Sequence, residues 1–160
     1  MTTLSVMTIY HDSICDGEGL RSVVFLAGCP HHCKGCHNPE SWNMRNGKEM
    51  SVDDILAELK ANPLTDVTLS GGEPFLQEEA VLELVKRIKA ETDKTIWSWS
   101  GWTFEELKTH PIRAEILRYI DVLVDGRFII EQRDTKLKWR GSPNQRVLKL
   151  ENGEVVEQLY

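Results

Sequence analysis

The sequence has little positive charge, few cysteines and no long apolar run. A membrane-crossing helix needs about 20 consecutive apolar residues, and no stretch of the 160 residues approaches that length. No apolar signal-peptide stretch follows Met1. The formal net charge is -6, whereas a nucleic-acid surface is normally basic. We therefore expect a cytoplasmic protein that binds neither membranes nor nucleic acids.

Internal repeats, low-complexity segments and shifts of composition are also missing, so we expect one domain over residues 1–160. With 41% hydrophobic residues the chain can bury a proper core. A closed eight-stranded α/β barrel typically takes about 250 residues. A barrel built from this chain is therefore expected to be partial.

Three of the four cysteines stand close together, at Cys29, Cys33 and Cys36, with the spacing Cys-x3-Cys-x2-Cys. Glycine and proline residues within 28–36 predict a tight loop here rather than a helix. Iron-sulfur clusters usually take four protein ligands. Three thiolates would therefore leave one iron of a four-iron cluster open to a small molecule.

Other interpretations of the cysteines stay open at this point. A tetrahedral zinc site with three cysteines and one histidine is chemically reasonable, since three histidines lie nearby: His31, His32 and His37. Disulfides are disfavoured, because four cysteines are too few for a disulfide-stabilised secreted domain of this length. Cys15 stands apart, and its simplest interpretation is a small thiol with no ligand role.

A second motif, Gly-Gly-Glu-Pro, follows an apolar run at 66–69 that predicts a buried strand, and it precedes a helix expected from about Gln77. It therefore lies at the carboxyl end of a strand, which is the face where α/β folds bind ligands. Gly71 and Gly72 let the backbone approach a ligand closely, while Glu73 supplies a carboxylate. Alone, such a segment is typical of an ordinary turn between a strand and a helix.

Strands and helices are expected to alternate along the chain. Expected strands lie at 4–9, 22–27, 66–69, 95–99, 121–124, 146–150 and 154–159. The last two are expected to form a terminal hairpin around Asn152 and Gly153. Expected helices follow Ser51, begin near Gln77, begin after the capping residue Thr103, and run from Pro111 to about Tyr119. This alternation favours a sheet of mostly parallel strands with right-handed crossovers.

Polar residues at two further strand ends are candidates for contacts to a bound cofactor, since such groups tend to face the ligand site. They are Ser98, Ser100 and Asp125. The neighbouring Trp97 and Trp99 are expected to pack in the core. For the segment 140–146, an exposed polar loop and a role at a cofactor or partner surface both stay open.

The cysteine loop resembles the signature loop of the radical S-adenosylmethionine (radical SAM) enzymes, and its extension to Trp42 resembles their glycyl-radical activase branch. The Gly-Gly-Glu-Pro turn is similar to the segment with which these enzymes hold the methionine ammonium group. The stretch 16–21 resembles a turn of the activases, with Glu18 where proline is usual. The stretches 125–128 and 140–146 resemble activators of the anaerobic ribonucleotide reductase, with Arg127 where proline is common.

This resemblance implies a partial, open radical SAM-type βα barrel. It implies a 4Fe-4S cluster on Cys29, Cys33 and Cys36, and S-adenosylmethionine held by the Gly71–Pro74 turn, which includes Pro74 itself. An electron donor such as a flavodoxin or ferredoxin would reduce the cluster, S-adenosylmethionine would yield a 5′-deoxyadenosyl radical, and the catalytic subunit of the anaerobic ribonucleoside-triphosphate reductase would receive a glycyl radical. Many family members carry an aromatic residue before the third cysteine, where this chain has Gly35, so the adenine must pack elsewhere.

Two alternative functions stay open. Within the same chemistry, the protein would activate another glycyl-radical enzyme or act as a radical SAM synthase on a pterin-like small molecule. Outside it, the protein would be a zinc-stabilised interaction module without catalysis. The sequence does not indicate the oxidised glycine, the oligomeric state or the cluster potential.

Overall fold

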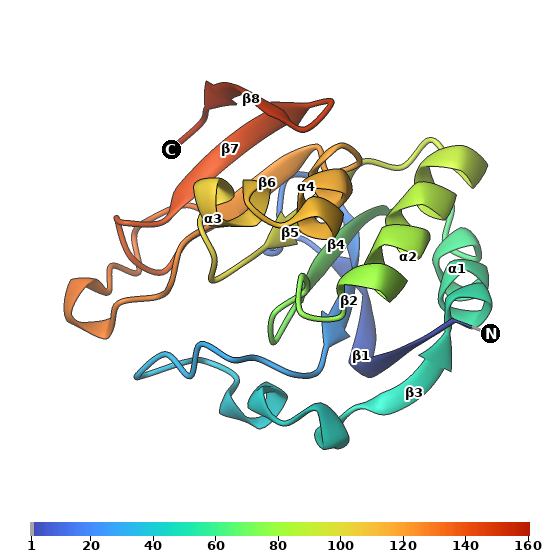
Figure 1. Ribbon diagram of the computed structural model, residues 1–160, viewed down its shortest axis with the longest axis horizontal. Coiled ribbons are helices and arrows are strands. Elements are labelled where there is room, and N and C mark those ends of the chain that lie inside the picture. The colour runs from blue at the N-terminus through green and yellow to red at the C-terminus, as the bar shows by residue number, and fades with distance from the viewer. Residues whose placement is uncertain (1) are drawn as a thin grey trace.

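The computed structural model describes residues 2–160, built around one open eight-stranded sheet with the strand order β3-β1-β2-β4-β5-β6-β7-β8 (Figure 1). The strands are β1 (Thr3–Ser13), β2 (Arg21–Leu26), β3 (Lys48–Ser51), β4 (Asp66–Gly71), β5 (Ile96–Trp99), β6 (Val122–Asp125), β7 (Arg146–Glu151) and β8 (Glu154–Gln158). The helices are α1 (Val52–Lys60), α2 (Glu78–Glu91), α3 (Phe104–Lys108) and α4 (Pro111–Leu117), with the short 3-10 helices η1 (Pro39–Trp42), η2 (Met44–Asn46) and η3 (Ile130–Gln132). The chain is thus a mixed α/β protein.

The strand directions correct one prediction. The four central strands β2, β4, β5 and β6 are parallel to one another, but the other four of the seven pairings are antiparallel. The expectation of mostly parallel strands is therefore wrong. One reason is the length of a connection: parallel neighbours need a crossover of a dozen or more residues, whereas only residues 14–20 join β1 to β2. The expected antiparallel hairpin of β7 and β8 around Asn152 and Gly153 is confirmed.

Local signals at the ends of elements are confirmed. The Ser51 hydroxyl accepts a hydrogen bond from Asp54 N at the start of α1. Thr103 and Glu106 form the expected capping box at α3. Strand β3 was not predicted, because its four mostly exposed residues show no hydrophobic alternation.

The two faces of the sheet have different cover. All four helices lie against one face (Figure 1), where the main core cluster gathers alternate strand residues such as Leu69, Ile96 and Leu123 with the inner sides of the helices. The opposite face carries a smaller cluster around Trp97 and Val124. The site described next opens on this second face. No helix within residues 2–160 combines the length and apolar character that crossing a bilayer requires.

Candidate functional site

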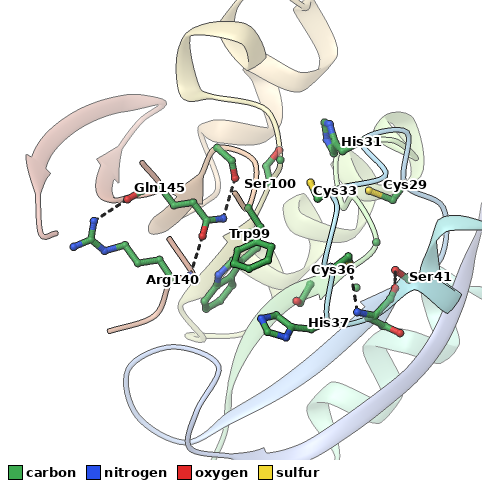
Figure 2. A pocket seen from close by; sticks show the side chains of 18 of the residues that line it. Cys29, His31, Cys33, Cys36, His37, Ser41, Trp99, Ser100, Arg140 and Gln145 are labelled. Carbon is green, nitrogen blue, oxygen red and sulfur yellow. Dashed lines mark hydrogen bonds between the residues drawn. The ribbon is translucent and has the colours of Figure 1, made fainter. Parts of the chain in front are cut away.

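A cavity of about 500 Å³ lies between the cysteine loop and the second face of the sheet. This volume falls within the range of about 300–1,000 Å³ that is usual for small-molecule sites. Phe25, Ser70 and Trp99 line it from β2, β4 and β5, and the exposed His37 lies at its edge. Figure 2 shows the cysteine loop on one side of this space, with Arg140 across from it.

All three cysteines of the loop line this cavity as free thiols, half-buried. The backbone holds the loop in place, since Gly28 N donates to Ser41 O at 2.6 Å and Cys29 N to Trp42 O at 3.2 Å. Burial raises the pKa of the Cys29 and Cys33 thiols above the ordinary value. All four described cysteines are free thiols.

Gly35, where an aromatic residue is common in the radical SAM enzymes, is packed against the segment after β6. Its φ is +75°, and a Cβ atom there would lie 2.1 Å from Ile130 Cδ1. An aromatic side chain at this position would therefore have to displace the Ile130 side chain and would strain a backbone at positive φ. The packing against Ile130 thus gives a reason for glycine at position 35, where many radical SAM enzymes carry an aromatic residue.

Each of the nearby histidine rings contacts another side chain. The His31 ring donates to Glu73, the His32 ring stacks on Trp42 at 4.6 Å, and the His37 ring lies 5.4 Å from Phe128. One zinc ion needs ligand atoms close around a single point, because its bonds are only about 2.0–2.3 Å long. No group of three or more His, Cys, Asp or Glu side chains among residues 2–160 is gathered in that way.

Glu73 is fully buried and joins three loops. Its carboxylate accepts hydrogen bonds from His31 Nε2 at 2.7 Å, from Gly101 N at 2.7 Å and from Phe75 N at 3.0 Å, and the Ser100 hydroxyl lies 2.9 and 3.0 Å from its two oxygens. We call these five residues the Glu73 network. It ties the cysteine loop to the segments that follow β4 and β5.

The contacts of His31 fix its tautomer. Arg127 Nε, which can only donate, lies 3.2 Å from His31 Nδ1. Nδ1 is therefore the acceptor, and Nε2 carries the hydrogen that is donated to Glu73. The imidazole thus lies between a cationic and an anionic side chain.

The expected cofactor residues fall into two groups. Gly71, Gly72 and Ser100 line the cavity, whereas Glu73 and Pro74 are buried behind its wall. The tight packing explains the glycine at position 71, because a Cβ atom there would lie 2.2 Å from the backbone oxygen of the last residue of β2. Their contacts to a cofactor stay a prediction.

Ser98 and Asp125 lie on the other face of the sheet. In a strand successive side chains point to opposite faces, so both share the face of the main core. Ser98 is buried and donates to a neighbouring backbone carbonyl. Asp125 accepts from Phe104 N at the start of α3 and pairs with Arg146 at 2.5 Å. Neither residue lines the cavity.

Several lining residues were not singled out from the sequence as site residues. Trp139, Arg140 and Gln145 reach the cavity from the connection between β6 and β7, and Cys15 reaches it from the connection after β1. Trp99 Nε1 donates to the Trp139 carbonyl. Both side chains line the cavity and also pack, partly buried, against the second core cluster, in which Trp97 is buried, so the expected core packing of Trp97 and Trp99 is confirmed on this face. The resemblance at 140–146 was the only sequence signal for this part of the wall.

The sequence is similar to those of known iron-sulfur proteins. Residues 15–148 match a family model described as a 4Fe-4S single cluster domain. Anaerobic ribonucleoside-triphosphate reductase-activating proteins are 41% identical in Haemophilus influenzae, over 89% of this chain and 96% of theirs, and 45% identical in Vibrio cholerae, over 85% and 92%. The chain belongs to this family. The activating protein of Pasteurella multocida is 40% identical, over 89% of this chain and 95% of its own.

Membership of the activating-protein family bears on the three thiols, because the matched family model describes a 4Fe-4S domain. The donor set fits such a cluster, because three free cysteines on one loop face one cavity. Cysteine thiolates are the ligands that hold such clusters.

Proposed function

We propose that the protein is a single radical SAM domain that uses S-adenosylmethionine to generate a glycyl radical on the anaerobic ribonucleoside-triphosphate reductase. The observation that carries this proposal is the position of three free cysteines on one wall of the cavity, in a chain whose relatives are named as activators of that reductase. We also propose that the open sheet acts as a partial barrel around this cavity.

Cys29, Cys33 and Cys36 would hold the cluster. When bound, a 4Fe-4S cluster supplies the single electron that splits S-adenosylmethionine into methionine and a 5′-deoxyadenosyl radical, which then takes a hydrogen atom from a glycine of the reductase. That electron comes from a donor such as a flavodoxin or ferredoxin. The protein contributes orientation and exclusion of water around these groups.

The cavity wall supports this role for its own residues. Gly71 and Gly72 present backbone next to the cysteine loop with no side chain between. Arg140 lines the cavity, but its guanidinium points away from the cysteine loop (Figure 2) and donates to the backbone carbonyls of Pro143 and Gln145.

The test uses anaerobically reconstituted protein, dithionite, S-adenosylmethionine and the reductase catalytic subunit. We expect methionine and 5′-deoxyadenosine to form, and a glycine-centred radical to appear in the electron paramagnetic resonance spectrum of the reductase. The Cys33→Ala variant should lose both products. Cys15→Ala makes the same chemical change on a thiol outside the cluster loop and should retain the iron and sulfide content of the parent.

A radical on another glycyl-radical enzyme, with none on the reductase, would replace the proposed partner but keep the chemistry. Absence of S-adenosylmethionine cleavage by the iron-loaded protein would refute the chemistry itself. Equal cleavage by Cys33→Ala and the parent would show that the loop does not hold the cluster.

A further inference from the structure

Positive charge is concentrated in one connection of the chain. Residues 127–146, between β6 and the start of β7, include six Lys and Arg residues against two Asp and Glu residues. The whole chain has 19 against 25, so the other residues hold thirteen against twenty-three. The segment that supplies Trp139 and Arg140 to the cavity is thus basic in an otherwise acidic protein.

Cations on the helical side of the molecule are mostly neutralised by ion pairs. The paired residues there are Lys60, Arg87, Lys89, Lys108, Arg113 and Arg118. Four exposed cations around the cysteine loop and the basic connection have neither an ion pair nor a side-chain hydrogen bond within residues 2–160, and we call them the basic rim: Lys34, Arg133, Lys136 and Lys138.

The basic rim lies next to the cavity. Leu137 and Trp139 line it, while the intervening Lys136 and Lys138 are exposed. The Lys138 ammonium lies 5.5 Å from the centre of the Trp139 ring, which itself lines the cavity. Two acidic residues share this segment, Glu131 and Asp134, and neither pairs with a rim cation.

Lys34 adds to the rim from the opposite wall. It precedes Gly35, whose backbone packs against Ile130 of the basic connection. Figure 1 shows the two segments, in blue and in orange, projecting from the same side of the sheet. Lys34 is thus the one cation that the cysteine loop, residues 28–36, adds to those of the basic connection, while the acidic Asp16 lines the cavity from the connection after β1.

A protein whose glycine is to reach this cavity must cover the opening and bring its own surface against the basic rim. Removing unpaired cations from water without a counter-charge is unfavourable, and like charges across an interface repel. The covering surface must therefore supply carboxylates. We propose that the basic rim is the docking surface for an acidic segment of the reductase that flanks its target glycine. This inference rests on the proposed function.

The test compares two charge reversals of equal size. Lys136→Glu with Lys138→Glu changes the rim, and Lys86→Glu with Lys149→Glu changes two exposed lysines elsewhere that also lack ion pairs. Each double variant is reconstituted with its cluster. Far-UV circular dichroism and the absorbance of the cluster then verify that the variant is folded. Association with the reductase catalytic subunit is then measured by surface-immobilised binding at several salt concentrations.

We expect the rim pair to associate about tenfold more slowly at low salt, with the difference shrinking as salt screens the charges. The control pair should associate at the parent rate. Equal rates for all three proteins, or equal slowing by both pairs, would overturn the inference while leaving the proposed function intact.

Two further outcomes are informative. Slower reduction of the rim pair by flavodoxin, with unchanged reductase binding, would assign the rim to the electron donor and refute the inference. A parent protein that cleaves S-adenosylmethionine yet neither binds nor activates the reductase would overturn both the inference and the proposed partner.

Discussion

Replacing Glu73 by glutamine tests whether this buried carboxylate holds the cysteine loop in place. Glutamine keeps the shape of the side chain but exchanges one acceptor oxygen for a donor. If the amide oxygen stays toward His31 and Gly101, the amide nitrogen faces Phe75 N, which then has no acceptor. The Ser100 hydroxyl can turn to accept instead of donating.

The size of the effect follows from these contacts. One buried N–H group left without a partner costs roughly 1–3 kcal/mol, and the remaining hydrogen bonds lose about 1 kcal/mol each when their acceptor is no longer charged. Relief from burying a charge offsets part of this loss. We expect Glu73→Gln to lower the free energy of unfolding by about 2 kcal/mol, which is roughly a thirtyfold change in the unfolding equilibrium.

The assay is urea unfolding of the cluster-free protein under reducing conditions, with amide hydrogen exchange read at Phe75 and Gly101. Glu79→Gln makes the same change at an exposed position of α2 and should alter stability by less than about 0.5 kcal/mol. Unchanged stability of Glu73→Gln, with both amides still protected, would refute the role given to the Glu73 network.

Two further changes address close packing and helix capping. Gly71→Ala should cost about 3 kcal/mol of unfolding free energy, because its Cβ atom meets Leu26 O at 2.2 Å; Gly19→Ala, equally at positive φ but with open space, should cost only about 1 kcal/mol. Equal losses of unfolding free energy for the two variants, measured by urea titration, would contradict this. Hydrogen bonding from Thr103 lowers the pKa of Glu106 below its ordinary value of 4.5, so its stabilisation is present above that pH and is lost as the pH falls through the lowered pKa. Glu106→Gln should therefore unfold less steeply in acid than the parent, and identical acid-unfolding curves would exclude this contribution.

Much of the fold was accessible from the sequence because its local signals agree with one another. Helix α1 has a capping serine at Ser51 and apolar residues at helical spacing, and the structure retains both. The hairpin turn at Asn152 and Gly153 was marked by residues that tolerate positive φ. Short-range chemistry fixes such elements.

Two features were harder to predict from the sequence: the direction of the outer strands, and which face of the sheet each side chain of the inner strands points to. β5 and β6 have four residues each and are buried on both faces, so no polar alternation indicates which side chains face the helices. Ser98 and Asp125 were therefore expected toward a cofactor, although they face the main core. The alternation of strands and helices also does not show which strands pair antiparallel on either side of the four parallel central strands.

Long-range contacts at the site could not be predicted from the sequence. His31 and Glu73 are 42 positions apart, and nothing local connects them. Gly35 has its reason in Ile130, which approaches only after the whole sheet has formed. The motifs thus indicated which residues matter, while their burial and partners followed from tertiary packing.

The most direct test of the central account is the electron paramagnetic resonance spectrum of the reduced, reconstituted protein with and without S-adenosylmethionine, alongside metal analysis. We predict about four irons and four sulfides per chain and a spectrum that shifts when S-adenosylmethionine is added, because that molecule binds the iron left open by Cys29, Cys33 and Cys36. A protein that binds one zinc and no iron, or a spectrum that does not change, would contradict it.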